Sequence, residues 1–328
     1  MSNSVFSLRR LSDDVRHQVI KSFDYVELIS YSLISRNSKV LVQSFNLELD
    51  RFIVKIHVDL LMFSMTFKGC DECHKFQIYH ANRVSARLFR LNVITNVIKV
   101  ERPINTPWPN NFERFSLSTP DLSFIGWFEH FKFLLKLNET KFSATANEEV
   151  FDTVKIRSLF PKWTTVSVCC GRPRYYRKIF DLFVPCVKNI ELDTHLGIAR
   201  YPRKVLFHNF NRFTSWYQLT LDDLLILNAF VIFIRSFSIS DINRFVKEWI
   251  RGSNPRMKYI RIYENDAIDE TKLLKGIKHQ IMPDGVERRT RDGRDVVGNI
   301  DIRNNKGILA TINVFYGQRY GIDMTVWN

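Results

Sequence analysis

The chain has 328 residues, 45% of them hydrophobic and 25% charged, a composition that predicts one large or two ordinary folded domains and excludes a disordered protein. Its formal net charge of +14 suits an acidic protein, a nucleic acid or an anionic surface as partner. The longest nearly apolar run, residues 224–234, is far shorter than the roughly 20 residues of a membrane-spanning helix, so we expect no membrane association.

The cysteine content and the N-terminal residues indicate the cellular compartment in which the protein is expected. The five cysteines are scattered and odd in number, in a chain too large to need disulfides for its stability. Residues 1–10 lack the positive start and apolar stretch of a secretory signal. We therefore expect a reducing compartment, which is the cytoplasm, the nucleus or both.

Two short amphipathic helices are predicted near the start of the chain. The first should begin at Ser12, whose side chain can cap free backbone N–H groups. The second should follow at once, because Asp24 and Glu27 have the spacing of a capping box. The apolar residues that recur at helical spacing along the two helices are Val15, Val19, Ile20, Phe23, Val26, Ile29 and Leu33.

A third, weaker helix is predicted over residues 36–45, with Val40 and Leu41 pointing inward. Residues 6–45 form a segment too small to bury a core of its own. This predicts a docking module whose apolar surface is covered by another protein. The alternative is an ordinary helical bundle that packs on its own domain.

The same segment resembles an F-box. Leu11 and Ser12 stand where that family has Leu-Pro, Ile20 and Phe23 lie near its Ile-Phe positions, and residues 24–28 match its Asp-Leu step. The resemblance implies that the segment binds a Skp-type adaptor and, through it, a cullin scaffold. The adaptor-binding residues would be Leu8, Leu11, Ser12, Val15, Val19, Ile20, Phe23, Leu28, Ile29 and Leu33.

The region that follows is predicted to mix strands and helices. Residues 47–67 carry alternating apolar residues typical of two strands, and residues 92–100 suggest another. Thr119 followed by Pro120 predicts a helix start, because Pro is favoured in the first helical position. The inward stripe of that helix would be Phe124, Phe128, Phe131 and Leu135.

From about residue 150 short strands and helices alternate. The clearest helix should have Ser240 as its cap and end at Gly252. The alternation predicts parallel pairing in a degenerate, leucine-rich-repeat-like layer, with a compact α/β sandwich as the alternative. The predicted strands are residues 153–156, 165–169, 189–192, 205–207, 231–234 and 259–262, followed by an antiparallel C-terminal β cap of residues 296–302, 308–315 and 320–327.

A second resemblance lies within this alternating region. The runs Thr220-Leu-Asp-Asp-Leu-Leu-Ile-Leu-Asn and Asn243-Arg-Phe-Val-Lys-Glu-Trp-Ile-Arg-Gly-Ser-Asn-Pro are similar to the nematode F-box-associated type-2 domain. The two resemblances occur in the order that such proteins have. They imply an α+β protein with an F-box at residues 1–45, a mixed strand and helix region at residues 46–150 and a substrate-recognition region at residues 151–328.

Two groups of residues have spacings that reactive sites also use. Cys70, Cys73 and His74 have the spacing of a haem attachment site, and with His80 they could hold zinc, but a second ligand pair is not evident nearby. A loop between strands with reduced thiols is the simpler interpretation. Asp222 and Asp223 follow Thr220 in the way that helix caps require, which favours capping over paired catalytic carboxylates.

No phosphate-binding glycine loop, nucleophile elbow or zinc-protease motif occurs, so we expect a binding protein without enzymatic activity or cofactor. The resemblances imply a substrate receptor of an SCF-type ubiquitin ligase, with an unknown protein as its target. An adaptor-binding protein that acts outside ubiquitination is an alternative.

The most basic stretch, residues 172–212, has nine Lys or Arg residues and three acidic residues. Tyrosines between these cations suit base stacking, so a nucleic-acid-binding protein is a further alternative, which we rank below an acidic protein target. The predicted target-binding residues in this stretch are Arg172, Arg174, Tyr175, Tyr176, Arg200, Tyr201, Arg203 and Lys204.

Overall fold

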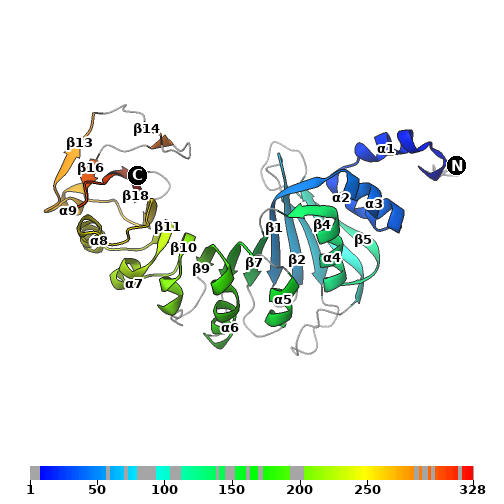
Figure 1. The fold of residues 1–328 in the computed structure, drawn as a ribbon, viewed down its shortest axis with the longest axis horizontal. Helices are drawn as coiled ribbons and strands as arrows, with labels where there is room; N and C mark the ends of the chain where they lie inside the picture. Colours follow the sequence, from blue (N-terminus) through cyan, green and yellow to red (C-terminus); the bar gives the residue numbers. More distant parts are fainter. Residues whose placement is uncertain are drawn as a thin grey trace. The chain divides into compact units, whose positions relative to one another are not determined.

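The computed structural model describes most of the chain (Figure 1), namely residues 8–56, 60–69, 73–79, 94–103, 112–137, 140–144, 152–159, 163–168, 173–192, 203–283, 288–289, 295–296, 300–316 and 320–327. It divides into two compact units. The first comprises residues 1–141 and 150–152, and the second comprises residues 142–149 and 153–328. Both units combine helices with strands, which confirms the α+β class.

The first unit begins with helices that follow the predicted capping pattern in part. The backbone N–H of Glu27 donates to the Asp24 carboxylate at 2.8 Å, and the N–H of Asp24 donates to Glu27 at 2.8 Å, so the capping box is confirmed. Ser12 occupies the cap position, but its side chain makes no capping hydrogen bond, so that detail was wrong. These elements are η1 (Leu8–Arg10), α1 (Asp13–Lys21), α2 (Tyr25–Ser32) and α3 (Arg36–Ser44).

An antiparallel sheet follows, in which each strand pairs with the next along the chain from β1 to β5. The two strands predicted over residues 47–67 are confirmed, and β6 adds to β1 in parallel. The strands are β1 (Leu47–Ile56), β2 (Leu60–Phe67), β3 (Cys73–Tyr79), β4 (Ile94–Pro103), β5 (Phe112–Ser123) and β6 (Leu135–Leu137).

The helix predicted at Thr119 starts later. Strand β5 continues to Ser123, and α4 (Phe124–Leu134) begins there, with the Ser123 side chain accepting from the N–H of Gly126. Pro120 is tolerated because β5 is the outermost strand and its pairing with β4 is irregular opposite this residue. Pairing with β4 therefore prevailed over the local preference of Pro for a helix start.

Aromatic rings form the core of the first unit. The rings of Phe63 on β2 and Phe124 on α4 are stacked with their centroids 4.8 Å apart, and Phe131 lies 5.1 Å from Phe63. The predicted inward stripe is confirmed for Phe124, Phe128 and Phe131, which are buried on α4, whereas Leu135 is buried but belongs to β6. Phe52 on β1 continues this cluster, so α4 covers one face of the antiparallel sheet.

The second unit alternates strands and helices. Strands β8 to β12 pair in chain order and in parallel, which confirms the predicted pairing. The elements are β7 (Thr140–Ala144), α5 (Thr153–Leu159), β8 (Thr165–Val168), α6 (Pro173–Phe183), η2 (Val184–Cys186), β9 (Asn189–Leu192), η3 (Arg203–Phe207), β10 (Phe210–Ser215), α7 (Leu221–Ile226), β11 (Ala229–Arg235), α8 (Ile239–Arg251), β12 (Tyr259–Glu264) and α9 (Glu270–Leu273).

Two predicted strands of this unit are helical instead. Residues 153–156 open α5, where the buried residues Thr153 and Ile156 have helical and not alternating spacing. Residues 205–207 lie in the 3₁₀ helix η3, where two adjacent side chains are buried and Phe207 is 66% exposed. The strand of this repeat is β10, which lies outside the predicted strands.

Helix α8 packs on one face of the parallel strands (Figure 1). Its residues Phe245, Val246 and Trp249 are buried, as predicted, and so are Ile232 and Ile260 on the strands. Its cap is Ser238 and not Ser240, and it ends at Gly252, whose φ of 110° lies in the left-handed region that glycine favours. Helix α8 therefore buries one side of the strands only.

The C-terminal antiparallel cap is confirmed. Strand β18 pairs antiparallel with β12 and with β17, and the sheet continues through β16 to β13. Residues 295–296 pair with a separate short strand instead of extending β16 as predicted. The strands are β13 (His279–Ile281), β14 (Arg288–Arg289), β15 (Asp295–Val296), β16 (Ile300–Arg303), β17 (Leu309–Phe315) and β18 (Tyr320–Val326).

Candidate protein-binding surfaces

Apolar side chains are exposed on α1, on α3 and in the turn between α2 and α3. Val15 is 45% exposed, Ile34 is 64% exposed and Val40 is 51% exposed. The prediction that Val40 points inward was wrong, because Val42 occupies the buried side of α3. Exposed aliphatic side chains on short helices suit contact with another protein.

The predicted adaptor-binding residues separate into two groups. Ile20, Leu28 and Ile29 are buried within the first unit, where they hold the helices together. Ser12 and Val15 are exposed, and the others are half-buried: Leu8, Leu11, Val19, Phe23 and Leu33. A partner can contact this second group directly, whereas the buried residues only hold the helices in position.

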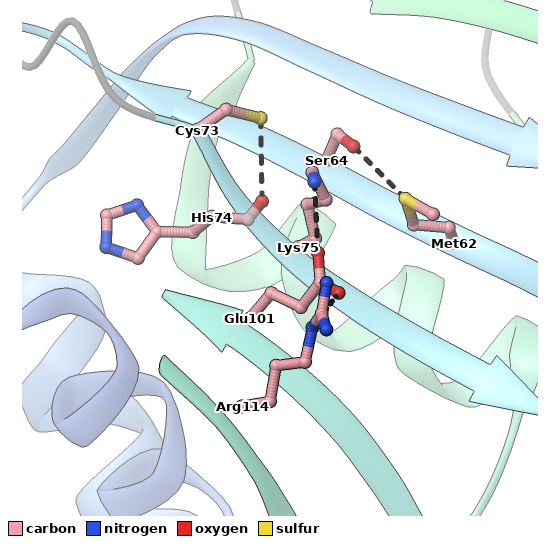
Figure 2. A network of polar contacts seen from close by, with 7 residues as sticks. All are labelled: Met62, Ser64, Cys73, His74, Lys75, Glu101 and Arg114. Carbon is pink, nitrogen blue, oxygen red and sulfur yellow. Dashed lines mark hydrogen bonds and ion pairs between the residues drawn. The ribbon is translucent and has the colours of Figure 1, made fainter. Parts of the chain in front are cut away.

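Helix α2 is fixed on the sheet by stacked rings. The ring of Tyr25 lies 3.7 Å from that of Phe67 on β2, and the His74 ring lies 5.4 Å from Phe67 at a right angle. His74 is thus part of the packing between α2 and the sheet. Its neighbour Cys73 projects to the other side of β3, as Figure 2 shows, so the two side chains do not converge on one ion.

Metal binding has little support among the described residues. No group of three His, Cys, Asp or Glu side chains in the described ranges stands close enough to hold a metal ion. Cys70 and His80, which the zinc alternative needs, lie outside the described residues.

Glu101 lies at the centre of a charge network across β3, β4 and β5 (Figure 2). It accepts from Lys75 Nζ at 3.0 Å and from Arg114 Nε at 2.8 Å, and these residues are its direct neighbours in the strand register. Burial alone would raise the pKa of Glu101, but the two hydrogen bonds outweigh it and lower that pKa. The network joins three strands, and its positive and negative charges are paired with one another within the sheet.

Two of the predicted target-binding residues form ion pairs within the chain. Arg203 Nε lies 3.0 Å from Asp223, and Lys204 Nζ lies 2.5 Å from Asp181. A half-open pocket of about 170 Å³ lies beside Lys204, with Phe180 in its wall. The other predicted residues are outside the described side chains: Arg172, Arg174, Tyr175, Tyr176, Arg200 and Tyr201.

A second surface, absent from the sequence predictions, lies on the face of β10 to β12 opposite α8. At its centre Arg261 makes two hydrogen bonds of 2.6 Å with the two carboxylate oxygens of Asp323 on β18. The hydroxyl of Tyr259 donates to the same carboxylate at 2.9 Å. Hydrogen bonding to Asp323 outweighs burial and raises the pKa of Arg261, so its positive charge is fixed.

Aromatic rings surround the Arg261 guanidinium. It lies 5.2 Å from the ring centroid of Phe315, 5.8 Å from that of Tyr263 and 5.9 Å from that of Tyr259. Trp216 lies 5.4 Å from Tyr263 and extends the cluster. Rigid Tyr, Trp and Arg side chains on a partly exposed face are the residues that dominate protein-binding surfaces.

A signal for this surface was present in the sequence. Residues 259–264 read Tyr-Ile-Arg-Ile-Tyr-Glu, which places aliphatic residues on one face of a strand and aromatic or charged residues on the other. A strand is predicted over residues 259–262, but the side chains on its other face form one cluster only when neighbouring strands are placed in register.

Comparison with known proteins places the family resemblance in this unit. Residues 201–262 match the model of a family described as F-box associated. The chain is also similar to F-box associated domain-containing protein sdz-33 of Caenorhabditis elegans, with 23% identity over 294 residues that cover 85% of this chain and 87% of the relative. The predicted resemblance to an F-box-associated domain is therefore confirmed for this part of the chain.

No solved structure matches the chain. In the part of the chain that the structure describes, no helix is long and apolar enough to cross a membrane.

Proposed function

We propose that this chain is a substrate receptor of an SCF-type ubiquitin ligase in the cytoplasm or nucleus. Helices α1 to α3 would bind a Skp-type adaptor and, through it, a cullin scaffold, while the second unit binds the protein to be modified. The ligase chemistry then belongs to other subunits, and this chain contributes proximity and orientation without cofactor or catalytic residue.

The observation that carries the proposal is the exposed apolar surface of α1 to α3, in a chain whose second unit matches the F-box-associated model. Burial of the exposed side chains of Val15, Ile34 and Val40 against a partner would be favourable, at roughly 25 cal/mol per Å² of apolar area removed from water. The strand and helix alternation of the second unit resembles a leucine-rich repeat, in which an open sheet face is available for a target.

The test is capture of a purified Skp-type adaptor by the full chain. Val15→Asp and Ile34→Asp should each weaken capture at least tenfold, because each places an unpaired charge in the contact. Both side chains are exposed, so the fold should be retained. Val154→Asp is the matched control, since Val154 is 56% exposed on α5 of the second unit, and this variant should bind normally.

Substitutions at Ile20 or Leu28 are poor tests, because both side chains are buried and their loss would unfold the helices. Adaptor capture that survives both exposed-site variants would contradict the assigned surface. Adaptor capture without adaptor-dependent ubiquitination of any bound protein would favour a role outside ubiquitination.

A further inference from the structure

The open face of β10 and β11 carries two arginines that flank a phenylalanine. Arg235 and Phe233 lie two residues apart on β11 and therefore point to the same side. Arg212 on β10 pairs in register with Val231, and its guanidinium lies 5.7 Å from the Phe233 ring centroid. Arg212 on β10 and Phe233 and Arg235 on β11 thus lie on the same face of the sheet, and we call these three residues the arginine line.

The charges of the arginine line are not neutralised within the described part of the chain. Arg212 and Arg235 are exposed, and no described acidic side chain forms an ion pair with either. Two acidic residues on nearby strands have other contacts: Asp323 on β18 binds Arg261, and Glu264 on β12 accepts from the backbone N–H of Phe237 at 2.6 Å. Glu191, two strands from Phe233, also has an interaction of its own.

The arrangement of these three residues favours one kind of ligand. The Arg212 backbone pairs with Val231, but its guanidinium extends to 5.7 Å from the Phe233 ring centroid, and Arg235 follows Phe233 two residues along β11 on the same face. An extended peptide also brings alternate residues to one side. Acidic residues on both sides of an apolar residue would meet the two arginines and Phe233.

We propose that the arginine line binds an extended acidic segment of the target, with Asp or Glu residues on both sides of an apolar or aromatic residue. The Arg261 cluster beside it supplies rigid aromatic area for the neighbouring part of the target. This inference rests on the proposed function, because it makes the segment the recognition element of a substrate.

Binding of a synthetic peptide to the full chain tests the inference without the adaptor. The probe is fluorescein-labelled Gly-Ser-Glu-Thr-Phe-Thr-Glu-Ser-Gly, and the comparison peptide has Lys in place of both Glu residues. Fluorescence anisotropy should give at least about tenfold tighter binding of the Glu peptide, and the difference should shrink as salt is added.

Arg212→Glu and Arg235→Glu should each weaken binding of the Glu peptide about tenfold, since each turns an attraction into a repulsion. The matched control is Arg244→Glu on α8, an exposed arginine 3.8 Å from Asp241, which should bind the peptide normally. A short single-stranded oligouridine, similarly labelled, examines the nucleic-acid alternative.

Equal binding of the Glu and Lys peptides, no measurable binding, or unchanged affinity in both arginine variants would each overturn the inference. Oligouridine binding that Arg212→Glu abolishes, without peptide binding, would assign the surface to nucleic acid. Adaptor capture is measured separately, so its loss would reject the proposed function while leaving a genuine peptide site in evidence.

Discussion

Ser32 on α2 and His130 on α4 share a buried hydrogen bond of 2.8 Å between Oγ and Nε2, which joins the N-terminal helices to the helix that covers the antiparallel sheet. Burial, and then repulsion by nearby Lys39, lowers the pKa of His130 from 6.5 to about 4. His130 therefore stays neutral in the folded protein at neutral pH. Its protonation would oppose the contact between these helices.

Stability should consequently fall on acidification. The unfolded chain binds a proton at His130 below about pH 6.5, whereas the folded chain does so only near pH 4, so the stabilisation is present above pH 6.5 and is lost toward pH 4. The loss should be about 3 kcal/mol, since each pKa unit corresponds to about 1.4 kcal/mol. Urea denaturation of the full chain between these two pH values measures it.

Two variants test whether His130 causes this loss of stability at low pH. His130→Gln should flatten the pH dependence in this window, and Lys39→Gln should reduce it, because the repelling charge is removed. His208→Gln is the control, since His208 is exposed in the second unit and should leave the curve unchanged. An identical pH dependence in His130→Gln would show that other groups control it.

Gly321 is constrained by close contacts across the sheet. A Cβ at this position would stand 2.5 Å from the backbone oxygen of Ile262 and would clash with the ring of Phe315, its register partner on β17. Gly321→Ala should therefore destabilise the second unit by roughly 2 kcal/mol or more, as overpacking does. Thermal unfolding measures the shift, and Gly321→Ala combined with Phe315→Leu should not fully restore stability, because the clash with backbone remains.

Thr220 and Asp223 form a capping box at the start of α7, as predicted in place of a catalytic role for the carboxylates. The N–H of Asp223 donates to Thr220 Oγ1 at 3.2 Å, and the N–H of Thr220 donates to the Asp223 carboxylate at 3.1 Å. Thr220→Ala should cost about 1 kcal/mol of folding stability, the typical value for a lost N-cap. Asp222→Asn is the control, because Asp222 is exposed and takes no part in the box, and it should change stability by less than about 0.5 kcal/mol.

Features that depend on residues close together in the sequence were predicted more accurately than features that depend on tertiary contacts. The Asp24 and Thr220 capping boxes depend on residues three apart and were predicted correctly. The β5 extension through Pro120 depends on pairing with β4, and the helical start of α5 depends on which side chains its neighbours bury, so neither was visible locally. Predicting the surface around Arg261 requires the register of three strands. Predicting which residues of the N-terminal helices can contact a partner requires the burial of Ile20 and Leu28, which depends on tertiary packing.

The pair formed by Arg261 and Asp323 should contribute to stability as well as to the binding surface. Asp323→Asn would leave the half-buried guanidinium without its counter-charge and should cost roughly 2 kcal/mol, less than the loss expected for a fully buried pair. Urea denaturation measures this cost. Asp295→Asn is the matched control, because the pair of Asp295 with Arg289 is exposed and should be worth less than about 1 kcal/mol.

A double variant separates the charge from the packing. Arg261→Met with Asp323→Leu removes both charges while keeping similar volume, and it should recover most of the stability that Asp323→Asn loses. The double variant should nevertheless bind more weakly any ligand that contacts the aromatic cluster, because the planar guanidinium among Tyr259, Tyr263 and Phe315 is gone. Stability that stays low in the double variant would mean that the hydrogen bonds of Asp323 to Arg261 and Tyr259 order this face, and not only its charge balance.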